Sequence, residues 1–169
     1  CGKTSIAKVI SNTTKYKFIQ LNAVTAGVAD IKQAVEESKN SLFNPSGKCI
    51  LFIDEIHRFN KLQQDALLPF VENGTIILIG ATTENPYFSV NKALISRSMV
   101  VKLNPLTYTD IFKILKNALA NKEGLGNYKI DIEDSTLEAI AKLSGGDVRT
   151  ALNTLELAVL TTERNGDGT

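Results

Sequence analysis

Asp54 and Glu55 are two adjacent carboxylates that directly follow the apolar run 49–53. An unbroken apolar run predicts a strand buried on both faces, and this strand would place the two acids at its carboxyl end. Ligands bind at that edge of open α/β sheets. Acids so placed serve metal-assisted phosphoryl transfer: Asp54 would hold Mg²⁺ through water, and Glu55 would orient or deprotonate the attacking water. The alternative is a strand that stops at two solvated acids.

Gly2, Lys3 and Thr4 match the second half of the motif G-x-x-x-x-G-K-[ST] and precede apolar residues at helical spacing. In that motif backbone N–H groups cradle phosphates, the lysine neutralises the β/γ oxygens and the hydroxyl coordinates Mg²⁺. We therefore predict that Gly2, Lys3, Thr4, Ser5 and Asp54 bind ATP, with Thr4 and Asp54 serving Mg²⁺. The tripeptide alone occurs by chance, and the downstream acids make the prediction specific.

Thr83 follows a second apolar run, 75–80. If the two strands are neighbours, its hydroxyl would lie beside the acids, where it could hold the attacking water or touch the γ-phosphate. Turn chemistry explains the Thr, Asn and Pro residues of this segment equally well. His57 is the only histidine of the chain and has no second ligand at metal spacing, so we interpret it as a structural or hydrogen-bonding residue.

Two arginines lie near predicted helix ends. Arg97 falls in the last turn of a predicted helix, where the helix dipole favours a cation, so the pattern alone assigns it no function. Arg149 falls in the first turn of another predicted helix, where a cation opposes the dipole. We interpret Arg149 as a residue that meets an anion such as a phosphate, and the alternative is an exposed side chain without a role.

The apolar spacing predicts strands that alternate with helices as far as residue 104. The predicted strands are 17–22, 49–54, 75–80 and 99–103, and helices are predicted from residue 3 and over 28–39, 61–73 and 92–98. Asn60 and Asn91 are predicted to cap the last two helices, and Pro69 to bend the first of these. This alternation predicts an α/β core with a parallel sheet over residues 1–104.

Only helices are predicted beyond residue 104. Thr107 with Asp110, and Ser135 with Glu138, resemble capping boxes, and Asp147 is predicted to cap a third helix. We therefore expect a small all-helical lid domain over residues 105–169. A turn is predicted at 44–47, and a frayed end or linker at 164–169.

Composition narrows the function classes. The chain has 169 residues, 43% of them apolar, and a net charge of +1, so it is neither a strongly basic nucleic-acid binder nor an acidic tail. The sequence has no apolar run near 18 residues and no basic leader, so we expect neither a membrane span nor a signal peptide. Two cysteines without metal spacing suit a reducing cytosol. Because the first residue is Cys1, we expect the chain to begin inside a larger gene product.

The order and spacing of these motifs resemble those of AAA+ ATPases of the clamp-loader-like branch. Gly2-Lys3-Thr4 matches the end of the P-loop, and 52–55 (FIDE) matches the Walker B acids. Thr83 falls where sensor 1 is expected, Ser96-Arg97 resembles the arginine-finger motif, and 146–149 (GDVR) resembles sensor 2. Closer still, the stretches 22–34, 52–76, 79–88 and 144–158 resemble the replication-associated recombination protein A family, also called MgsA-like or Werner-helicase-interacting ATPase.

The resemblance implies a DNA-stimulated ATPase of replication-fork maintenance, recombination and repair that uses ATP and Mg²⁺. It also implies homo-oligomers that act on gapped, forked or single-stranded DNA, with replication proteins such as single-strand-binding protein as further partners. The implied location is the bacterial cytoplasm, associated with the nucleoid. In the ring-shaped homo-oligomers that the resemblance implies, Arg97 would complete a neighbour's active site in trans. Arg149 would contact the nucleotide from the lid of its own subunit.

The sequence departs from that family pattern at its start. The first half of the P-loop and the preceding strand are missing, and loss of that central strand would leave two unpaired sheet edges. The family's oligomerisation region would lie beyond Thr169, so ATPase activity is expected of the intact protein rather than of this fragment. Two alternatives stay open: a clamp-loader or branch-migration subunit, and a nucleotide-gated scaffold without useful turnover. Glu55 argues against the scaffold, because a non-hydrolysing module needs no base.

Overall fold

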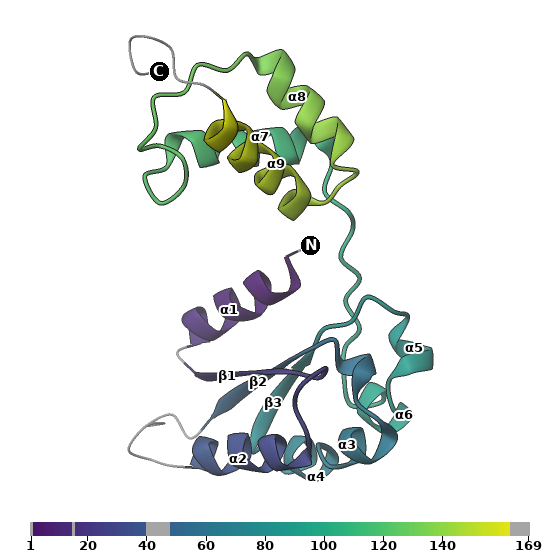
Figure 1. Ribbon diagram of the computed structural model, residues 1–169. Coiled ribbons are helices and arrows are strands. Elements are labelled where there is room, and N and C mark those ends of the chain that lie inside the picture. The colour runs from purple at the N-terminus through teal and green to yellow at the C-terminus, as the bar shows by residue number, and fades with distance from the viewer. Residues whose placement is uncertain (1, 15, 40–47, 163–169) are drawn as a thin grey trace. The chain divides into compact units, whose positions relative to one another are not determined.

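The computed structural model describes residues 2–14, 16–39 and 48–162, so the predicted turn at 44–47 and the tail at 164–169 lie outside the described residues. Backbone contacts divide the chain into two units, Gly2–Lys102 and Leu103–Thr169. Each unit has its own apolar core, and Figure 1 labels the helices and strands of each unit. The order of elements confirms the predicted class, an α/β part with a parallel sheet followed by helices.

The sheet of the first unit has three described strands in the order β1-β2-β3. They are β1 (Lys17–Asn22), β2 (Cys49–Asp54) and β3 (Ile76–Gly80), and both neighbouring pairs are parallel. Every residue of β2 is buried except Asp54. The central position of β2 therefore explains its unbroken apolar run, since both of its faces are covered.

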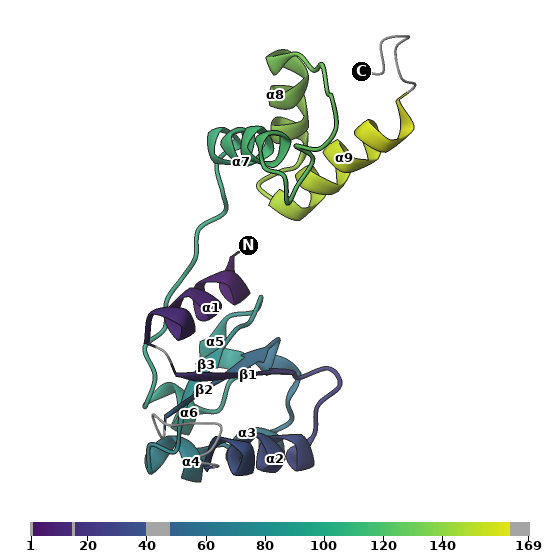
Figure 2. The ribbon, with the colours of Figure 1, turned by 90° about the vertical axis from the view of Figure 1, so that its left-hand side faces the viewer.

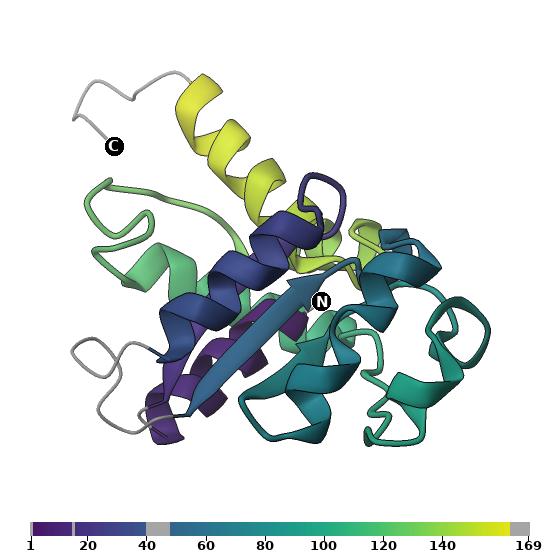
Figure 3. The same ribbon diagram turned by 90° about the horizontal axis from the view of Figure 1, so that it is seen from below.

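Helices cover the sheet on both faces. On one face α1 (Lys3–Thr14) packs Ala7 against Phe52 and Ala81. On the other face α2 (Val28–Lys39) places Ile31 and Val35 in a core shared with β2 and β3. Figures 1 and 2 show α1 and α2 on opposite sides of the sheet, and Figure 3, seen from below, shows α2 on the near side. The helices on both faces hold the sheet in place, and the carboxyl edge of this sheet carries Asp54 and Glu55.

The segment 61–73 forms two short helices, so the prediction of one bent helix is wrong. A 3₁₀ turn, η1 (Ile56–Arg58), is followed by α3 (Lys61–Asp65) and α4 (Leu68–Glu72). The predicted cap at Asn60 is confirmed, because its side chain accepts from the Gln63 N–H. The break has a local cause: Pro69 has no N–H to donate to the carbonyl of Asp65, the residue where α3 ends, and it stands instead in the first turn of α4.

The segment 92–103 also differs from its prediction. Helices α5 (Pro86–Ser89) and α6 (Lys92–Ile95) follow β3, and Asn91 caps α6 as predicted. Because α6 ends at Ile95, Arg97 lies in the turn beyond the helix rather than in its last turn. The predicted strand at 99–103 is absent. A strand forms by pairing its backbone with a neighbour, and among the described residues no strand pairs with this segment.

The second unit consists of three described helices around one core. They are α7 (Tyr108–Ala120), α8 (Asp134–Leu143) and α9 (Val148–Thr161). Each contributes two fully buried apolar side chains, listed in order as Ile111, Leu115, Leu137, Ala141, Ala151 and Leu155. No helix of the described residues is long and apolar enough to span a bilayer.

The three predicted caps of this unit have different outcomes. The capping box of Thr107 and Asp110 is confirmed, and Asp147 caps α9 by accepting from the Arg149 N–H. The capping box at Ser135 is wrong, because α8 begins at Asp134 with Glu133 as its N-cap. Ser135 is the second residue of α8, and its hydroxyl donates to the Glu133 carboxylate at 3.0 Å.

Candidate active site

Asp54 and Glu55 lie at the carboxyl end of the central strand. Asp54 is the last residue of β2 and stands in register with Asn22, the last residue of β1. The neighbouring β3 ends beside them at Gly80. Because parallel strands bring their carboxyl ends to one edge, polar residues that follow all three strands meet there. The two acids therefore lie where they were predicted, at the carboxyl edge of the parallel sheet.

Glu55 has an unusual backbone conformation. Its φ of 54° and ψ of 44° make it the only residue other than glycine with a positive φ in the described chain. The turn is held in place because the Ile56 N–H donates to the Ala81 carbonyl at 2.9 Å, and the Ala81 N–H donates to the Ile53 carbonyl at 2.9 Å. A left-handed conformation at such a residue costs about 1–3 kcal/mol, and such strain concentrates at functional sites.

The Thr83 side chain reaches Glu55 from the end of the neighbouring strand. Its hydroxyl donates to Oε2 of Glu55 at 3.2 Å. The sequence placed this hydroxyl beside the acids on the condition that β2 and β3 are neighbours, and they are. The hydrogen bond can orient the carboxylate for work on a water molecule.

His57 joins a network around Glu55 that the sequence did not predict. Its Nδ1 lies 2.9 Å from Oγ1 of Thr82 and 3.4 Å from Oε2 of Glu55, and its Nε2 lies 3.6 Å from Oε1 of Glu84. The imidazole is only 6% exposed. These contacts agree with the hydrogen-bonding role expected for His57. Thr82 and Glu84 follow β3 whereas His57 follows β2, so local sequence held no signal for these two contacts.

The segment from Gly2 to Ser5 forms the N-terminal end of α1. Gly2 has a φ of 87°, and Lys3 is the first residue of the helix. The first backbone N–H groups of a helix have no intrahelical acceptor, so those of Lys3, Thr4 and Ser5 are available to an anion. Because α1 leads back to the start of β1, its first turn lies toward the carboxyl ends of the strands (Figure 1). No hydrogen bond or ion pair links Lys3 or Thr4 to the two acids across the described residues.

The Arg97 guanidinium is bound by Glu72 and by groups of α6 and the turn after it, and no hydrogen bond or ion pair within the described residues links it to the two acids. Its Nη2 lies 2.7 Å from Oε1 of Glu72, and its Nη1 donates to the Ala93 carbonyl at 2.9 Å and to Oγ of Ser96 at 3.2 Å. The guanidinium satisfies a carbonyl at the end of α6, which is the structural explanation that the sequence left open. At 44% exposure its side chain still faces solvent, where another chain could meet it.

Arg149 belongs to the helical unit and stands in the first turn of α9. Its backbone N–H donates to Oδ1 of Asp147 at 3.0 Å, and its exposed side chain has no hydrogen bond or ion pair with any residue that the structure describes. The Thr150 hydroxyl and then the Arg149 N–H hold the pKa of the Asp147 carboxyl below its ordinary value. The Arg149 side chain is thus available to an anion.

The donor set suits Mg²⁺ better than a transition metal. Among the described residues no cluster of three or more His, Cys, Asp or Glu side chains could hold a metal ion. Mg²⁺ needs no such cage, because it takes one or two protein oxygens and completes its shell with phosphates and water. Thr4 and Asp54 are oxygen donors of that kind. Cys49 is buried inside β2, where burial raises the pKa of its thiol, so it stays protonated and takes no part.

Family models match both units. The model for the ATPase family associated with various cellular activities (AAA) matches residues 1–106, and the model for an AAA C-terminal domain matches residues 126–169. Among solved structures, the RuvB Holliday junction branch migration motor of Thermotoga maritima has a TM-score of 0.75 and 27% sequence identity. That similarity covers 98% of this chain and 55% of the motor's chain.

Curated relatives match over most of this chain. Replication-associated recombination protein A of Bacillus subtilis is 48% identical over 168 residues, which is 99% of this chain and 39% of that protein. The protein of the same name from Escherichia coli K12 is 48% identical over 157 residues, 92% of this chain and 35% of that protein. ATPase WRNIP1 of Dictyostelium discoideum is 43% identical over 159 residues, which is 94% of this chain and 18% of that protein. The chain thus spans well under half the length of these relatives.

Proposed function

Since this chain belongs to the ATPase family associated with various cellular activities, we propose that it carries the ATP-hydrolysing site of a longer protein. That protein acts on DNA in replication-fork maintenance, recombination and repair. Similarity to proteins named replication-associated recombination protein A and to a Holliday junction branch migration motor supports this function. Within the chain, residues 1–104 form the ATPase core and residues 105–169 the lid.

In this proposal ATP binds at the N-terminus of α1. Gly2, Lys3, Thr4 and Ser5 hold the phosphates through backbone N–H groups and the Lys3 ammonium, while Thr4 binds Mg²⁺ directly and Asp54 binds it through water. The exposed first turn of α1 and the oxygen donors support this assignment. Bound Mg²⁺ would neutralise charge on the phosphoryl oxygens.

Glu55 is the general base of the reaction. Its carboxylate accepts a proton from the attacking water, and the Thr83 hydroxyl holds that carboxylate in position. The observation that carries the proposal is the 3.2 Å hydrogen bond from Thr83 to Glu55, which joins the ends of two neighbouring parallel strands. A base fixed beside the Asp54 carboxylate is what hydrolysis requires and what nucleotide binding alone does not.

Two arginines complete the site. Arg97 acts in trans on the nucleotide of a neighbouring subunit in a homo-oligomer, and Arg149 contacts the nucleotide of its own subunit from the lid. The half-exposed guanidinium of Arg97 and the exposed side chain of Arg149 support these roles. Such a finger is worth about 10³–10⁵ in turnover in related phosphoryl-transfer enzymes.

The intact protein binds gapped, forked or single-stranded DNA, and the DNA stimulates its ATPase activity. Replication proteins such as single-strand-binding protein are its further partners. We place it in the bacterial cytoplasm with the nucleoid. Its relatives include bacterial proteins, which supports this location.

ATP hydrolysis by the intact protein, measured with and without gapped or forked DNA, tests this function. We expect turnover that DNA stimulates, and its loss in Arg97→Ala. Glu72→Gln is the matched control, because it breaks the same ion pair but keeps the arginine. Equal loss in both variants would reduce Arg97 to a structural partner of Glu72, and a protein that never turns over ATP would contradict the function.

The scaffold alternative is tested at Glu55. Glu55→Gln keeps the size of the side chain and its hydrogen bond from Thr83 but cannot take a proton. We expect turnover to fall to background while ATP binding persists. If the cellular function survives this change, the scaffold is correct.

The likeness to RuvB favours branch migration as the second candidate function. Migration of a synthetic Holliday junction in the presence of ATP would support it. Stimulation by gapped or forked DNA without migration supports the fork-acting function.

A further inference from the structure

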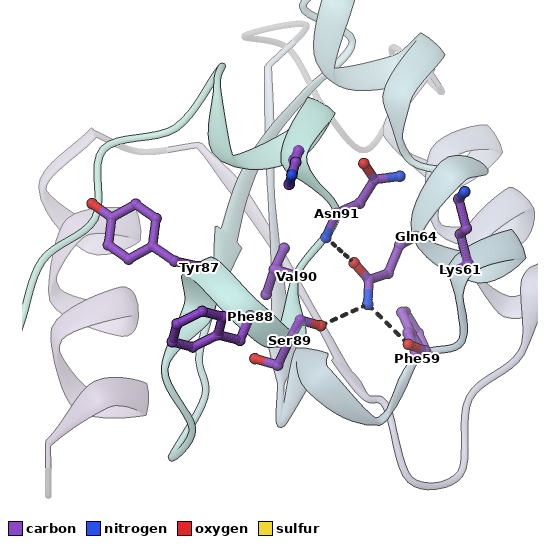
Figure 4. A pocket seen from close by; sticks show the side chains of 9 residues that line it. Phe59, Lys61, Gln64, Tyr87, Phe88, Ser89, Val90 and Asn91 are labelled. Carbon is purple, nitrogen blue, oxygen red and sulfur yellow. Dashed lines mark hydrogen bonds between the residues drawn. The ribbon is translucent and has the colours of Figure 1, made fainter.

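A hollow on the first unit combines exposed aromatic rings with lysines. It has a volume of about 440 Å³ and lies between α3 and the segment 87–92 (Figure 4). Its lining includes Lys61, Gln64, Tyr87, Phe88, Asn91 and Lys92. We call it the aromatic hollow. None of the residues assigned above to ATP or Mg²⁺ lines it, so it is a separate feature of the unit.

The rings at the aromatic hollow are exposed to an unusual degree. Phe88 is 90% exposed and Tyr87 is 61% exposed. Burying an aromatic side chain is favourable in free energy, and these two exposed rings forgo that gain. Clusters of exposed apolar groups mark interaction sites. In Figure 4 the two rings lie at one side of the hollow and Lys61 lies at the other, with Gln64 and Asn91 between them.

The charge of the aromatic hollow is uniformly positive. Lys61 and Lys92 line it, and no acidic side chain does. Within the described part of the chain neither ammonium forms an ion pair, unlike Lys17, Lys116 and Lys142. Asp65, one turn after Lys61 on α3, accepts from the Asn91 side-chain amide and does not line the hollow.

The aromatic hollow is held in shape by Gln64, which is 4% exposed. Its amide donates to the Phe59 carbonyl at 2.9 Å and to the Ser89 carbonyl at 3.3 Å, and its Oε1 accepts from the Asn91 N–H at 2.6 Å. These bonds tie the segment that carries the rings to α3. The rings are therefore presented by a fixed backbone, which lowers the entropy lost on binding.

We propose that the aromatic hollow binds single-stranded DNA, with unpaired bases stacked on Tyr87 and Phe88 and backbone phosphates paired with Lys61 and Lys92. Stacking platforms beside cations are how proteins hold single strands without reading sequence. A protein segment would also cover the rings, but two lysines without acids favour a polyanion. This inference rests on the proposed DNA function and gives it a surface that the net charge of +1 does not reveal.

Binding of a fluorescent oligothymidylate to the intact protein, titrated at several salt concentrations, tests the proposal. Phe88→Ala should weaken binding about 5- to 150-fold and leave the salt dependence unchanged, since stacking releases no counterions. Lys61→Ala with Lys92→Ala should lower the slope of log K against log salt by about 1.4, because two phosphate contacts are lost. Matched controls are Tyr128→Ala, and Lys32→Ala with Lys122→Ala, all of which change exposed side chains elsewhere.

Phe88→Trp gives a direct readout when its fluorescence is compared with that of the unsubstituted intact protein, because residues 1–169 include no tryptophan. It should keep the affinity, and its added fluorescence should be quenched by the single strand but not by blunt duplex, whose bases are already stacked. Tyr128→Trp should show no quenching.

The outcomes separate two failures: a wild type that binds no DNA contradicts the proposed function, whereas variants that bind like the wild type contradict only this surface. A Phe88→Ala protein of altered assembly mass would assign the aromatic hollow to a protein contact and overturn the proposal.

Discussion

At the scale of single residues, Glu55 is held by contacts from a neighbouring strand. Its left-handed backbone is fixed by the bond from Ile56 to Ala81, and its carboxylate accepts from Thr83. A base fixed before substrate arrives need not be reoriented during the reaction, which is why such positioning lowers the barrier. The Thr83 hydroxyl is therefore expected to act on turnover rather than on nucleotide affinity.

Thr83→Val should lower kcat of the intact protein by about 10- to 150-fold, the loss expected for one hydrogen bond to a charged group. The affinity for ATP should change little, because the hydroxyl contacts the base and not the phosphate-binding segment. Steady-state ATPase assays with a separate nucleotide-binding titration measure both quantities. Thr83→Ser keeps the hydroxyl and should retain activity. Unchanged kcat in Thr83→Val would leave Thr83 as a turn residue.

The sequence could predict single residues only where their chemistry was visible locally. Asp54 and Glu55 were identifiable because an apolar run ended at them, and Thr83 was a candidate only on the condition that its strand adjoins theirs, which the structure meets. The contacts of His57 with Thr82 and Glu84 were not identifiable, since they arise from two turns that meet only in the folded chain. The pairing of Arg97 with Glu72 was missed for the same reason.

At the scale of elements, the predictions that failed concern one helix break, one helix start and one strand that needs a partner distant in sequence. β2 followed from its own composition, because a strand buried on both faces must be apolar throughout. The segment 99–103 has a strand-like composition but no described neighbour to pair with. Pro69 marks the place where the segment 61–73 departs from a single helix, but its presence alone did not say that α3 would end before it and α4 begin there instead of one helix bending.

Gln64 joins α3 to the segment that leads into α6, so its loss should destabilise the first unit. Gln64→Leu removes three bonds to backbone groups, and each buried group left without a partner costs about 1–3 kcal/mol. Urea denaturation of the intact protein should show the unit's midpoint shifted to lower urea. Gln33→Leu is the control, because the Gln33 side chain is exposed and its one hydrogen bond among the described residues is to the exposed Glu37. Equal midpoints for the two variants would contradict this structural role.

The helix caps of the second unit should make its stability sensitive to acid. The Thr107 hydroxyl and then the Thr107 N–H lower the pKa of Asp110, and the Thr150 hydroxyl and the Arg149 N–H lower that of Asp147. Since both folded-state pKa values lie below the unfolded value of about 3.9, the bonds stabilise the unit above that pH. The stabilisation is lost as pH falls through the folded pKa values.

Asp110→Asn with Asp147→Asn should reduce this acid sensitivity, because asparagine keeps an oxygen that accepts these hydrogen bonds but does not titrate there. Thermal unfolding followed by far-UV circular dichroism at about pH 5 and about pH 2.5 measures it. The double variant should lose less Tm between the two pH values than the wild type. Asp131→Asn, a change at an exposed acid with no described hydrogen bond, should behave like the wild type. A double variant with the full acid loss would place the sensitivity elsewhere.

At the scale of the whole molecule, the two units are built around separate apolar cores. The core of the first unit is built from β2, β3 and the helices on the sheet, and that of the second from α7, α8 and α9. A unit of roughly 60 residues is marginally stable on its own, at about 0.05–0.15 kcal/mol per residue. Damage to one core should therefore unfold its own unit first.

Leu115→Ala should selectively open the helical unit. Leu115 is fully buried among the helices, and a leucine-to-alanine change in such a core costs about 2–5 kcal/mol, much of what a unit of this size has. Hydrogen exchange of the intact protein should show faster exchange in α7, α8 and α9 and unchanged protection in the three strands. Leu51→Ala, in the other core, should give the reverse pattern. If Leu115→Ala also exposed the amides of β2, the two cores would unfold as one, and the lid could not open without loosening the strand that carries the base.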